Sequence, residues 1–370
     1  MKIPTFKTGG LRKKAIAVSA AVAVASLSLV TASASAEDNP GFVLYSSQGY
    51  ASSVVAAFNA TNPGFTVTLN AASTGPLLQQ VQAEGTNPKW GALWIDGAIP
   101  FEYLDSIGML VRSSVPKAAK YTSLGTSNVP KNGSYIPTGV TETGVLCYDS
   151  SQVNVANLPS KWTDLTDSSY PLGMNDPSIS GPTYPLLAGV FSKLSKLPTN
   201  ATTAQVKAAI KKGEAFYEAI AKKKPGNLVV NAKNGATLGA ISNRAIGMAT
   251  IQGSACYSKT IGSMPTLGEK YLDASFVLPS AIGIDSKMPA VVRADAAKFA
   301  AWLLTAAGQD AMQKGDPAGD SLYWPIITGV TTSNAVIPAI ASTNPYIINP
   351  KLWAPYQTEI TAWFVKNFVN

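Results

Sequence analysis

Phe42-Val43-Leu44-Tyr45-Ser46-Ser47-Gln48-Gly49 is a short apolar run that ends in a polar turn, and a helical pattern follows it. This unit decides the fold because it recurs. An alternating run at residues 65–69 precedes Ser73-Thr74-Gly75-Pro76 and a second helical pattern, and the run at residues 92–95 ends in Asp96-Gly97. Strands that alternate with helices predict a parallel sheet with helices on its faces. Ligands of such sheets bind beyond the carboxyl ends of the strands, where all three polar turns are expected.

The second half of the chain repeats the unit. A strand at residues 172–174 precedes Asp176-Pro177-Ser178-Ile179-Ser180-Gly181-Pro182-Thr183, a strand at 228–230 precedes Asn234-Gly235-Ala236-Thr237, and a strand at 245–251 delivers Gln252-Gly253-Ser254-Ala255. A helix is predicted over residues 203–224, with its lysines on the solvated face. The same strand-turn-helix order therefore predicts a second sheet of the same kind.

Two α/β lobes are expected, each a mostly parallel sheet flanked by helices, with the first lobe interrupted by the second. Lobe 1 comprises residues 37–138 and 277–370, including the C-terminal helices, and lobe 2 comprises residues 139–276. The chain crosses between the lobes twice, and these crossings form a natural hinge. Capture of a ligand between two such lobes is a known domain-closure geometry.

Residues 1–36 have the composition of a secretion signal peptide. Residues 1–14 hold five basic and no acidic side chains, Ala15 to Val30 is almost entirely apolar, and Ala34-Ser35-Ala36 supplies the small residues of a cleavage site. We expect cleavage after Ala36 by the general secretory route, because no Arg-Arg pair is present. A retained N-terminal anchor is the alternative. Beyond residue 37 no apolar stretch approaches the roughly 20 residues of a spanning helix, so a soluble protein in the periplasm or extracellular space is expected.

The positive charge of the chain belongs mostly to this segment. Lys and Arg number 29 and Asp and Glu 21, a formal charge of +8, and removing residues 1–36 leaves 24 against 21, or +3. Charged residues make up only 14% of the chain, where roughly 25% is usual. No broad basic face is implied, and we expect no binding of nucleic acid.

Enzymatic chemistry finds little support in the residues available. Histidine is absent, which excludes Ser-His-Asp and Cys-His nucleophile systems and every zinc site that needs histidine. The nucleotide and metal motifs G-x-x-x-x-G-K-[ST], G-x-G-x-x-G, H-E-x-x-H and C-x-x-C do not occur. Ser114-Val115-Pro116-Lys117 fits the S-x-x-K of serine acyl enzymes, but Pro116 disfavours the required helix and no S-D-N follows. We expect neither an enzyme nor a cofactor.

The two cysteines, Cys147 and Cys256, lie 109 residues apart. In an oxidising compartment they are candidates for a disulfide, and the long loop gives such a bond entropic leverage. Pairing requires proximity that the sequence does not show, so two buried free thiols are the alternative.

Polar turns before helices are the candidate ligand site. One such turn is an ordinary helix N-cap. Several at one sheet edge indicate more, because helix N-termini present unpaired N–H groups to an anion while hydroxyls and amides complete its coordination. No Lys or Arg lies within these turns, which fits a small oxyanion held by neutral donors. The candidate residues are Ser46, Ser47, Gln48, Ser73, Thr74, Gly75, Asp96, Ser178, Ser180, Gly181, Thr183, Asn234, Gln252 and Ser254.

With these residues identified, the chain resembles an extracellular solute-binding protein of an ABC importer, in the group that includes ferric-iron and 2-aminoethylphosphonate binding proteins. The resemblance covers most of residues 41–320. It rests on Val43 to Gly49, Ser73 to Leu78, Trp94 to Gly97, Asp176 to Gly181, Leu278-Pro279-Ser280-Ala281-Ile282-Gly283 and the late Ala307-Gly308-Gln309. It implies a type 2 periplasmic-binding fold, a monomer that closes on a small-molecule solute and presents it to the membrane permease subunits.

The resemblance also bears on the ligand. Iron-binding relatives usually carry an adjacent tyrosine pair in the loop that matches Gln252 to Tyr257, whereas this chain has Ser254-Ala255 there. The Ser- and Thr-rich turns match phosphonate-type binders better, and Asp96 then faces a ligand amine. An aminophosphonate or similar oxyanion is the leading hypothesis. Ferric-iron transport, a sensory binding protein and a secreted enzyme are the alternatives.

Overall fold

The computed structural model describes residues 41–262, 264–317, 322–332 and 334–369. Strands and helices alternate along the chain, and the strands form two sheets. The predicted signal peptide, residues 1–36, lies outside the described residues. The strand order of the first sheet is β11-β10-β3-β1-β2, with β4 added on β10. The strands are β1 (Phe42–Ser46), β2 (Val67–Ala71), β3 (Ala92–Asp96), β4 (Ile136–Thr143), β10 (Ser275–Ile284) and β11 (Pro345–Tyr346).

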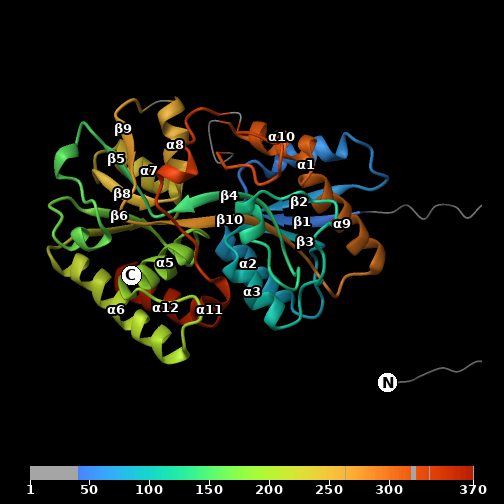
Figure 1. Cartoon of the computed structure of the whole chain (residues 1–370), viewed down its shortest axis with the longest axis horizontal. Helices are drawn as coiled ribbons and strands as arrows, with labels where there is room; N and C mark the ends of the chain where they lie inside the picture. Colours follow the sequence, from blue (N-terminus) through green and yellow to red (C-terminus); the bar gives the residue numbers. More distant parts are fainter. Residues whose placement is uncertain (1–40, 263, 318–321, 333, 370) are drawn as a thin grey trace, which may run out of the picture. The chain divides into compact units, whose positions relative to one another are not determined.

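Helices cover both faces of this first sheet, and with it they form the first lobe (Figure 1). Alternate side chains of the strands point to opposite faces. Leu44 and Trp94 therefore pack with α1 (Ala51–Asn59), α9 (Ala290–Leu303) and α10 (Ala306–Gly315), whereas Tyr45 and Ile95 pack with α2 (Thr74–Glu84) and α3 (Ile99–Ser106). The short helix α4 (Ser123–Ser127) follows in the connection to β4.

The second sheet has the strand order β7-β6-β8-β5-β9 and, with its helices, forms the second lobe. One face packs on α5 (Thr183–Ser195) and α6 (Thr203–Lys222), and the other on α7 (Asn234–Ser242) and α8 (Gly253–Gly262). Short 3-10 turns lie at Val155–Asn157 and Trp162–Thr166. The strands are β5 (Val145–Asp149), β6 (Leu172–Asn175), β7 (Leu228–Asn231), β8 (Met248–Ile251) and β9 (Leu267–Lys270).

The prediction of a two-lobed α/β fold is confirmed, and both sheets are mixed. Parallel pairing joins β1 to β2 and β3 in the first lobe, and β6 to β7 and β8 in the second. Antiparallel pairing joins β10 to β3 and β4, and β5 to β8 and β9. The antiparallel strands are the segments that carry the chain into and out of the second lobe.

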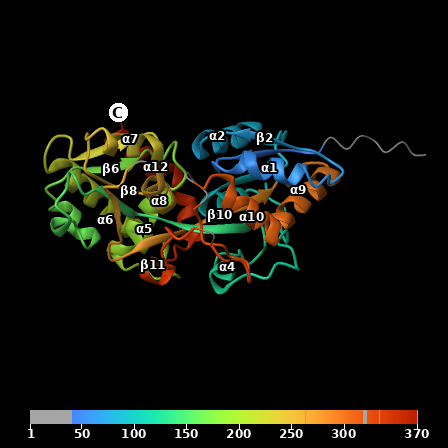
Figure 2. The same ribbon diagram turned by 90° about the horizontal axis from the view of Figure 1, so that it is seen from above.

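Strand β10 runs from the helices of the second lobe to those of the first (Figure 1, Figure 2). Phe276, near its start, packs with Trp162 in the core of the second lobe, whereas Ile282, near its end, packs with Trp94 in the core of the first. It pairs with β4 along the way, with Val277 opposite Glu142. These two long strands are the observed counterpart of the expected chain crossings.

The C-terminal helices differ from the expectation that assigned them to lobe 1. Helices α11 (Pro350–Trp353) and α12 (Gln357–Phe368), joined by a 3-10 turn at Ala354–Tyr356, contribute Trp353 and Phe364 to the core of the second lobe. Trp353 packs edge-on against Phe191 of α5, and Phe364 against Tyr217 of α6. An amphipathic pattern defines which face of a helix is apolar, but it does not identify the surface that this face covers. A further 3-10 turn lies at Ile340–Ser342.

None of the helices in the described ranges combines the length and apolar character needed to span a bilayer.

Candidate functional site

Asp96 is the centre of the candidate site on the first lobe. It ends strand β3 and is 4% exposed. The side-chain amide of Gln48, in the turn after β1, donates to Asp96 Oδ1 at 2.8 Å. The turn is itself held by Ser46, whose hydroxyl donates to the carbonyl of Trp94 on β3 at 2.9 Å and accepts from the backbone N–H of Gln48. The parallel pairing of β1 and β3 thus sets the amide beside the carboxyl group.

The second lobe contributes a row of amide side chains. Gln252 follows β8 and Asn234 begins α7, and the Asn234 amide donates to Gln252 Oε1 at 3.2 Å. Asn175, the last residue of β6, donates to Asn234 Oδ1 at 2.6 Å and to the Ser180 hydroxyl at 3.4 Å. The Gln252 amide also donates to Ser254 Oγ at 2.7 Å. Because β6 and β8 are parallel neighbours, these polar groups meet at one sheet edge.

Tyr323 joins the two sets of residues. Its hydroxyl donates to Asp96 Oδ1 at 2.8 Å and accepts from the Gln252 amide at 2.9 Å. Gln252 also makes a side-chain hydrogen bond with Asp96. The candidate residues of the two lobes therefore form one connected hydrogen-bond network, which we call the Asp96 network: Ser46, Gln48, Asp96, Asn175, Ser180, Asn234, Gln252, Ser254 and Tyr323.

A second contact between the lobes lies beside this network. The hydroxyl of Thr74, at the start of α2, donates to Ser47 Oγ at 2.9 Å. The backbone of the same turn meets the loop after β6 so closely that a Cβ on Gly75 would lie 1.8 Å from the carbonyl oxygen of Ser178. A Cβ on Gly181 would lie 2.4 Å from Thr74 Oγ1. Glycine is required at position 75 because the backbones of the two lobes meet there, whereas at position 181 the Thr74 side chain fills the space that a Cβ would need.

The side chains of three predicted residues take no part in the Asp96 network. Ser73 is the N-cap residue of α2 but its side chain makes no capping bond. Ser178 bonds within its own loop, donating to Asp176 Oδ1 at 2.7 Å. Thr183 is buried at the start of α5, where its backbone N–H donates to the Ser180 carbonyl. Within the described ranges, no side-chain hydrogen bond connects these three to the Asp96 network.

Sequence reasoning missed Asn175, Thr237 and Tyr323. The Thr237 hydroxyl donates to Asn175 Oδ1 at 2.6 Å and so orients the Asn175 amide. Asn175 adjoins a predicted turn, and extending that turn to the end of its strand finds it. Thr237 is the last residue of the predicted turn at residues 234–237, although it is not among the candidate residues. Tyr323 lies in a segment without periodicity, Leu322 to Pro325, so no local signal identifies it.

The electrostatics of the site centre on one carboxyl group. Burial raises the pKa of Asp96 to about 6, and the hydrogen bonds from Gln48, Tyr323 and Gln252 act in the opposite direction. No Lys or Arg takes part in the hydrogen bonds that build the Asp96 network in the described part of the chain. A buried carboxylate in such surroundings gains from an opposite charge within about 4 to 6 Å. The site can therefore accept a cationic group next to neutral hydrogen-bond donors.

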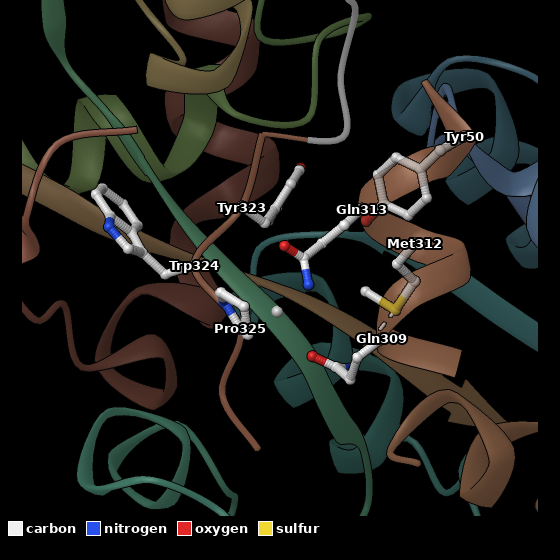
Figure 3. Close-up of a pocket in the computed structure, with 8 residues that line it drawn as sticks. Tyr50, Gln309, Met312, Gln313, Tyr323, Trp324 and Pro325 are labelled. Carbon is white, nitrogen blue, oxygen red and sulfur yellow. Dashed lines mark hydrogen bonds between the residues drawn. The ribbon is translucent and has the colours of Figure 1, made fainter. Parts of the chain in front are cut away.

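A small pocket lies next to Tyr323 (Figure 3). Gln309 lines it from α10, and its amide donates to the carbonyls of Thr138 and Leu303 at 2.9 and 2.8 Å. This bonding ties α10 to β4 and gives the late Ala-Gly-Gln motif a structural role. The other lining residues are Tyr50, Gly139, Met312, Gln313, Tyr323, Trp324 and Pro325.

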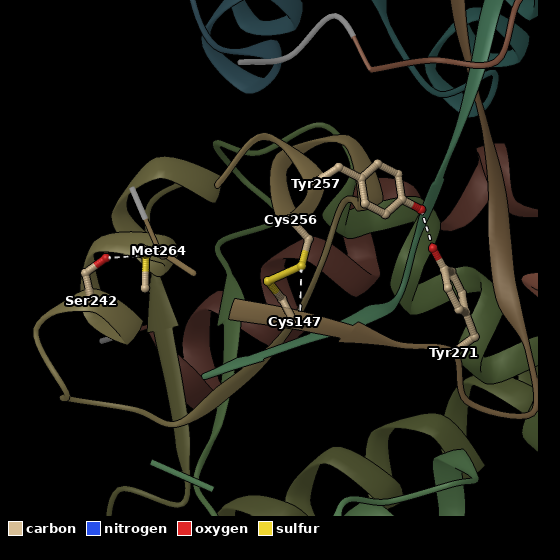
Figure 4. The surroundings of a disulfide bond; sticks show 7 residues. Cys147, Ser242, Cys256, Tyr257, Met264 and Tyr271 are labelled. Atoms are coloured by element: carbon tan, nitrogen blue, oxygen red, sulfur yellow. Dashed lines mark hydrogen bonds between the residues drawn. A yellow bond between two sulfur atoms is a disulfide. The ribbon is translucent and has the colours of Figure 1, made fainter. Parts of the chain in front are cut away.

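A disulfide bond holds the helix that follows Gln252 against the second sheet. Cys147 of β5 and Cys256 of α8 are bonded, with their Cα atoms 5.8 Å apart (Figure 4). Cys256 lies one helical turn after Gln252, and its backbone N–H donates to the Gln252 carbonyl. The disulfide ties the first turn of α8 to strand β5, and it thereby holds the backbone from which the Gln252 side chain extends.

The tyrosine next to Cys256 points into an apolar cluster. Tyr257 hydrogen-bonds through its hydroxyl to the hydroxyl of Tyr271 (Figure 4), and its ring packs with Val277 and Trp324.

Within the described ranges, no group of three or more His, Cys, Asp or Glu side chains is arranged to hold a metal ion.

Solved structures of known proteins share this fold. The iron-bound HitA of Pseudomonas aeruginosa is 20% identical with a TM-score of 0.67, over 87% of this chain and 98% of HitA. AfuA of Actinobacillus pleuropneumoniae, a periplasmic binding protein with fructose-6-phosphate bound, is 12% identical with a TM-score of 0.72, over 89% and 98%. A periplasmic thiamin binding protein is 16% identical with a TM-score of 0.63, over 88% and 95%. These three proteins bind three different ligands, namely iron, fructose-6-phosphate and thiamin.

A search of the curated proteins found no significant match. The sequence model of the bacterial extracellular solute-binding proteins matches residues 46–310, a range that includes every predicted site residue. The chain therefore belongs to the bacterial extracellular solute-binding proteins, which bind their ligands and are not enzymes.

Proposed function

We propose that this protein is the solute-binding component of an ABC import system, which captures a small oxyanion with an amine, such as an aminophosphonate, between its lobes. It then delivers this solute to membrane permease subunits. The observation that carries the proposal is the Asp96 network, in which one buried carboxyl group is surrounded by amides and hydroxyls from both lobes.

The two kinds of donor suit the two ends of such a solute. Asp96 supplies the negative charge that a protonated amine needs. Thr74, Asn234 and Ser254 lie in the first turns of α2, α7 and α8, where helix N-termini and hydroxyls favour an oxyanion. Binding through neutral donors rather than Lys or Arg is consistent with release to a permease.

Ferric iron is the alternative that the likeness to HitA raises. Amides and hydroxyls with a single carboxyl group suit an organic oxyanion, whereas Fe(III) is a hard cation best served by several anionic oxygens. The tyrosine that the Gln252 loop carries is bonded to Tyr271 in an apolar cluster. These contacts support the oxyanion over the metal ion.

A thermal-shift screen of the purified protein tests the proposal. The probes are 2-aminoethylphosphonate, ethylphosphonate, phosphate, sulfate, fructose-6-phosphate, thiamin and Fe(III)-citrate. A ligand at 100 times its Kd stabilises the folded state by about 2.7 kcal/mol. We expect the aminophosphonate to give the largest shift, and stabilisation by Fe(III)-citrate alone would overturn the proposal.

The proposal includes export. We infer that residues 1–36 are removed after Ala36 and that the protein acts as a monomer outside the cytoplasm, as the extracellular family suggests. N-terminal sequencing of the exported protein is expected to begin at Glu37, and an intact N-terminus would favour the anchored alternative.

A further inference from the structure

The hydroxyl of Tyr323 occupies a distinctive place between the lobes. It donates to Asp96 Oδ1 at 2.8 Å and accepts from the Gln252 amide at 2.9 Å. The Gln48 amide donates to the same Asp96 oxygen. Two donors that converge on one carboxylate oxygen fix the orientation of the whole carboxyl group, since its plane can no longer rotate without breaking both bonds.

The Tyr323 ring is held independently of these bonds. It packs edge-on against Tyr50, with ring centroids 5.8 Å apart, and Tyr50 packs in the same way against Trp94. Tyr323 is 4% exposed. The hydroxyl is therefore presented by a rigid aromatic stack, so its loss removes a hydrogen-bond donor without removing the packing.

We propose that Tyr323 is a positioning residue of the solute site, whose hydroxyl holds Asp96 in place for a protonated amine of the solute and links Asp96 to Gln252 of the second lobe. This inference rests on the proposed function and narrows it, because it names an amine as the group that Asp96 receives. The residue comes from the C-terminal third of the chain, outside every turn that supplies the other donors.

The amine follows from the charge of Asp96 and from the hydrogen-bond donors that surround it. Asp96 is the acidic member of the network, and the partners that face it are the amides of Gln48 and Gln252 and the phenol of Tyr323. Tyr323 is thus the one titratable group among these partners, and none of the three carries a positive charge. A solute with a protonated amine supplies the missing charge, whereas a purely anionic solute would meet like charge at this carboxylate.

The test compares Tyr323→Phe with Tyr121→Phe. Tyr121 is a matched control because its hydroxyl donates to the Pro137 carbonyl at 3.0 Å, outside the Asp96 network. Isothermal titration calorimetry measures the affinity of each protein for 2-aminoethylphosphonate and for ethylphosphonate, which lacks the amine. Losing a hydrogen bond to a charged group lowers affinity by about 10- to 100-fold, so Tyr323→Phe is expected to show that loss for the amine probe alone.

The pH dependence adds a readout that a purely structural role would leave unmoved. Affinity for the amine probe, divided by that for ethylphosphonate, is expected to fall as the pH drops through the pKa of Asp96, about 6. The wild type and Tyr323→Phe are titrated with the same two probes, so the ionisation of each phosphonate group contributes equally to both proteins. The Tyr323 hydrogen bond lowers the pKa of Asp96, so Tyr323→Phe is expected to move the midpoint to higher pH, and Tyr121→Phe is not.

A measurement on the ligand-free protein tests the role of Tyr323 separately from the identity of the solute. Carbon-13 NMR titration of the Asp96 carboxyl group is expected to give a higher pKa in Tyr323→Phe than in the wild type. An unchanged pKa, or an equal loss of affinity for both probes, overturns the role of Tyr323. If the wild type binds neither phosphonate, the proposed solute class fails, and the NMR titration alone decides whether Tyr323 positions Asp96.

Discussion

The backbone N–H of Gly75 donates a hydrogen bond to the carbonyl oxygen of Ile179 at 3.2 Å. Gly75 lies in the first turn of α2 in the first lobe, and Ile179 lies in the loop after β6 in the second. This backbone contact sits beside the Thr74 and Ser47 hydroxyls. The candidate site therefore adjoins a point where the two lobes touch directly, and we infer that the lobes use this contact when they close on a solute.

Gly75→Ala is expected to weaken solute binding, because the new Cβ would lie 1.8 Å from the Ser178 carbonyl oxygen. The loop must move away before the lobes can meet. Overpacking of this kind costs about 1 to 3 kcal/mol, which corresponds to roughly 5- to 150-fold in Kd. Calorimetry measures the affinity, and small-angle X-ray scattering is expected to show a larger radius of gyration in the presence of solute.

The matched control is Gly239→Ala in α7, where an added Cβ meets no atom within 4 Å. Alanine favours a helix over glycine, so this variant should bind as the wild type does and unfold at an equal or higher temperature. Wild-type affinity in Gly75→Ala would contradict a role for this contact in closure.

Thr74→Val is expected to weaken binding while preserving the fold. Valine keeps the shape of the side chain, which packs next to Gly181, but it cannot donate to Ser47. The loss of one neutral hydrogen bond amounts to about 0.5 to 1.5 kcal/mol, or roughly 2- to 12-fold in Kd. Thr74→Ser retains the hydroxyl and should bind nearly as the wild type does. Equal affinities of the two variants, measured by calorimetry, would remove the Thr74 hydroxyl from the site.

Most residues of the candidate site follow from local signals in the sequence. Gln252 directly follows the buried strand β8, Gln48 comes two residues after β1, and Asn234 comes three residues after β7. Within each lobe, parallel pairing brings such positions to one sheet edge. Tyr323 has no such signal, since it reaches Asp96 through a segment with no strand or helix of its own. Its contribution depends on tertiary packing against Tyr50.

The same distinction explains the fold. The apolar runs at residues 42–45 and 92–95 predict two buried strands of the first sheet. Because successive side chains of a strand point to opposite faces, Leu44 and Tyr45 pack on opposite layers. The apolar face of α12 is equally clear in the sequence, yet its partner is the second lobe. Patterning identifies what must be buried, whereas the choice among several apolar surfaces is decided by the whole chain.

Glu142 is expected to make stability fall as the pH rises. It lies on β4, fully buried, where Thr343 donates to its Oε1 at 2.5 Å and, within the described ranges, its Oε2 has no hydrogen-bond partner. Burial raises the pKa of Glu142 to about 7. The unfolded chain loses this proton near pH 4.5, so the folded state is destabilised progressively between about pH 4.5 and 7.

Glu142→Gln removes this dependence. The variant should be more stable than the wild type at pH 8, by up to about 3 kcal/mol, and the difference should vanish near pH 4. Urea unfolding across this range measures it. Glu218→Gln is the control, since Glu218 pairs with Lys222 on the surface of α6. The idea fails if the stability of Glu142→Gln varies with pH as the wild type does.

The Cys147–Cys256 disulfide is expected to stabilise both the fold and the site. A loop of 109 residues places the gain at about 2 to 4 kcal/mol, chiefly by restricting the unfolded chain. The double variant Cys147→Ala/Cys256→Ala should therefore unfold at lower urea concentration. Because Cys256 anchors the first turn of α8, which follows Gln252, the solute affinity of the double variant should fall as well. A reductant should shift the wild type toward the double variant and leave the variant unchanged, whereas equal wild-type stability with and without reductant would show that this bond contributes nothing.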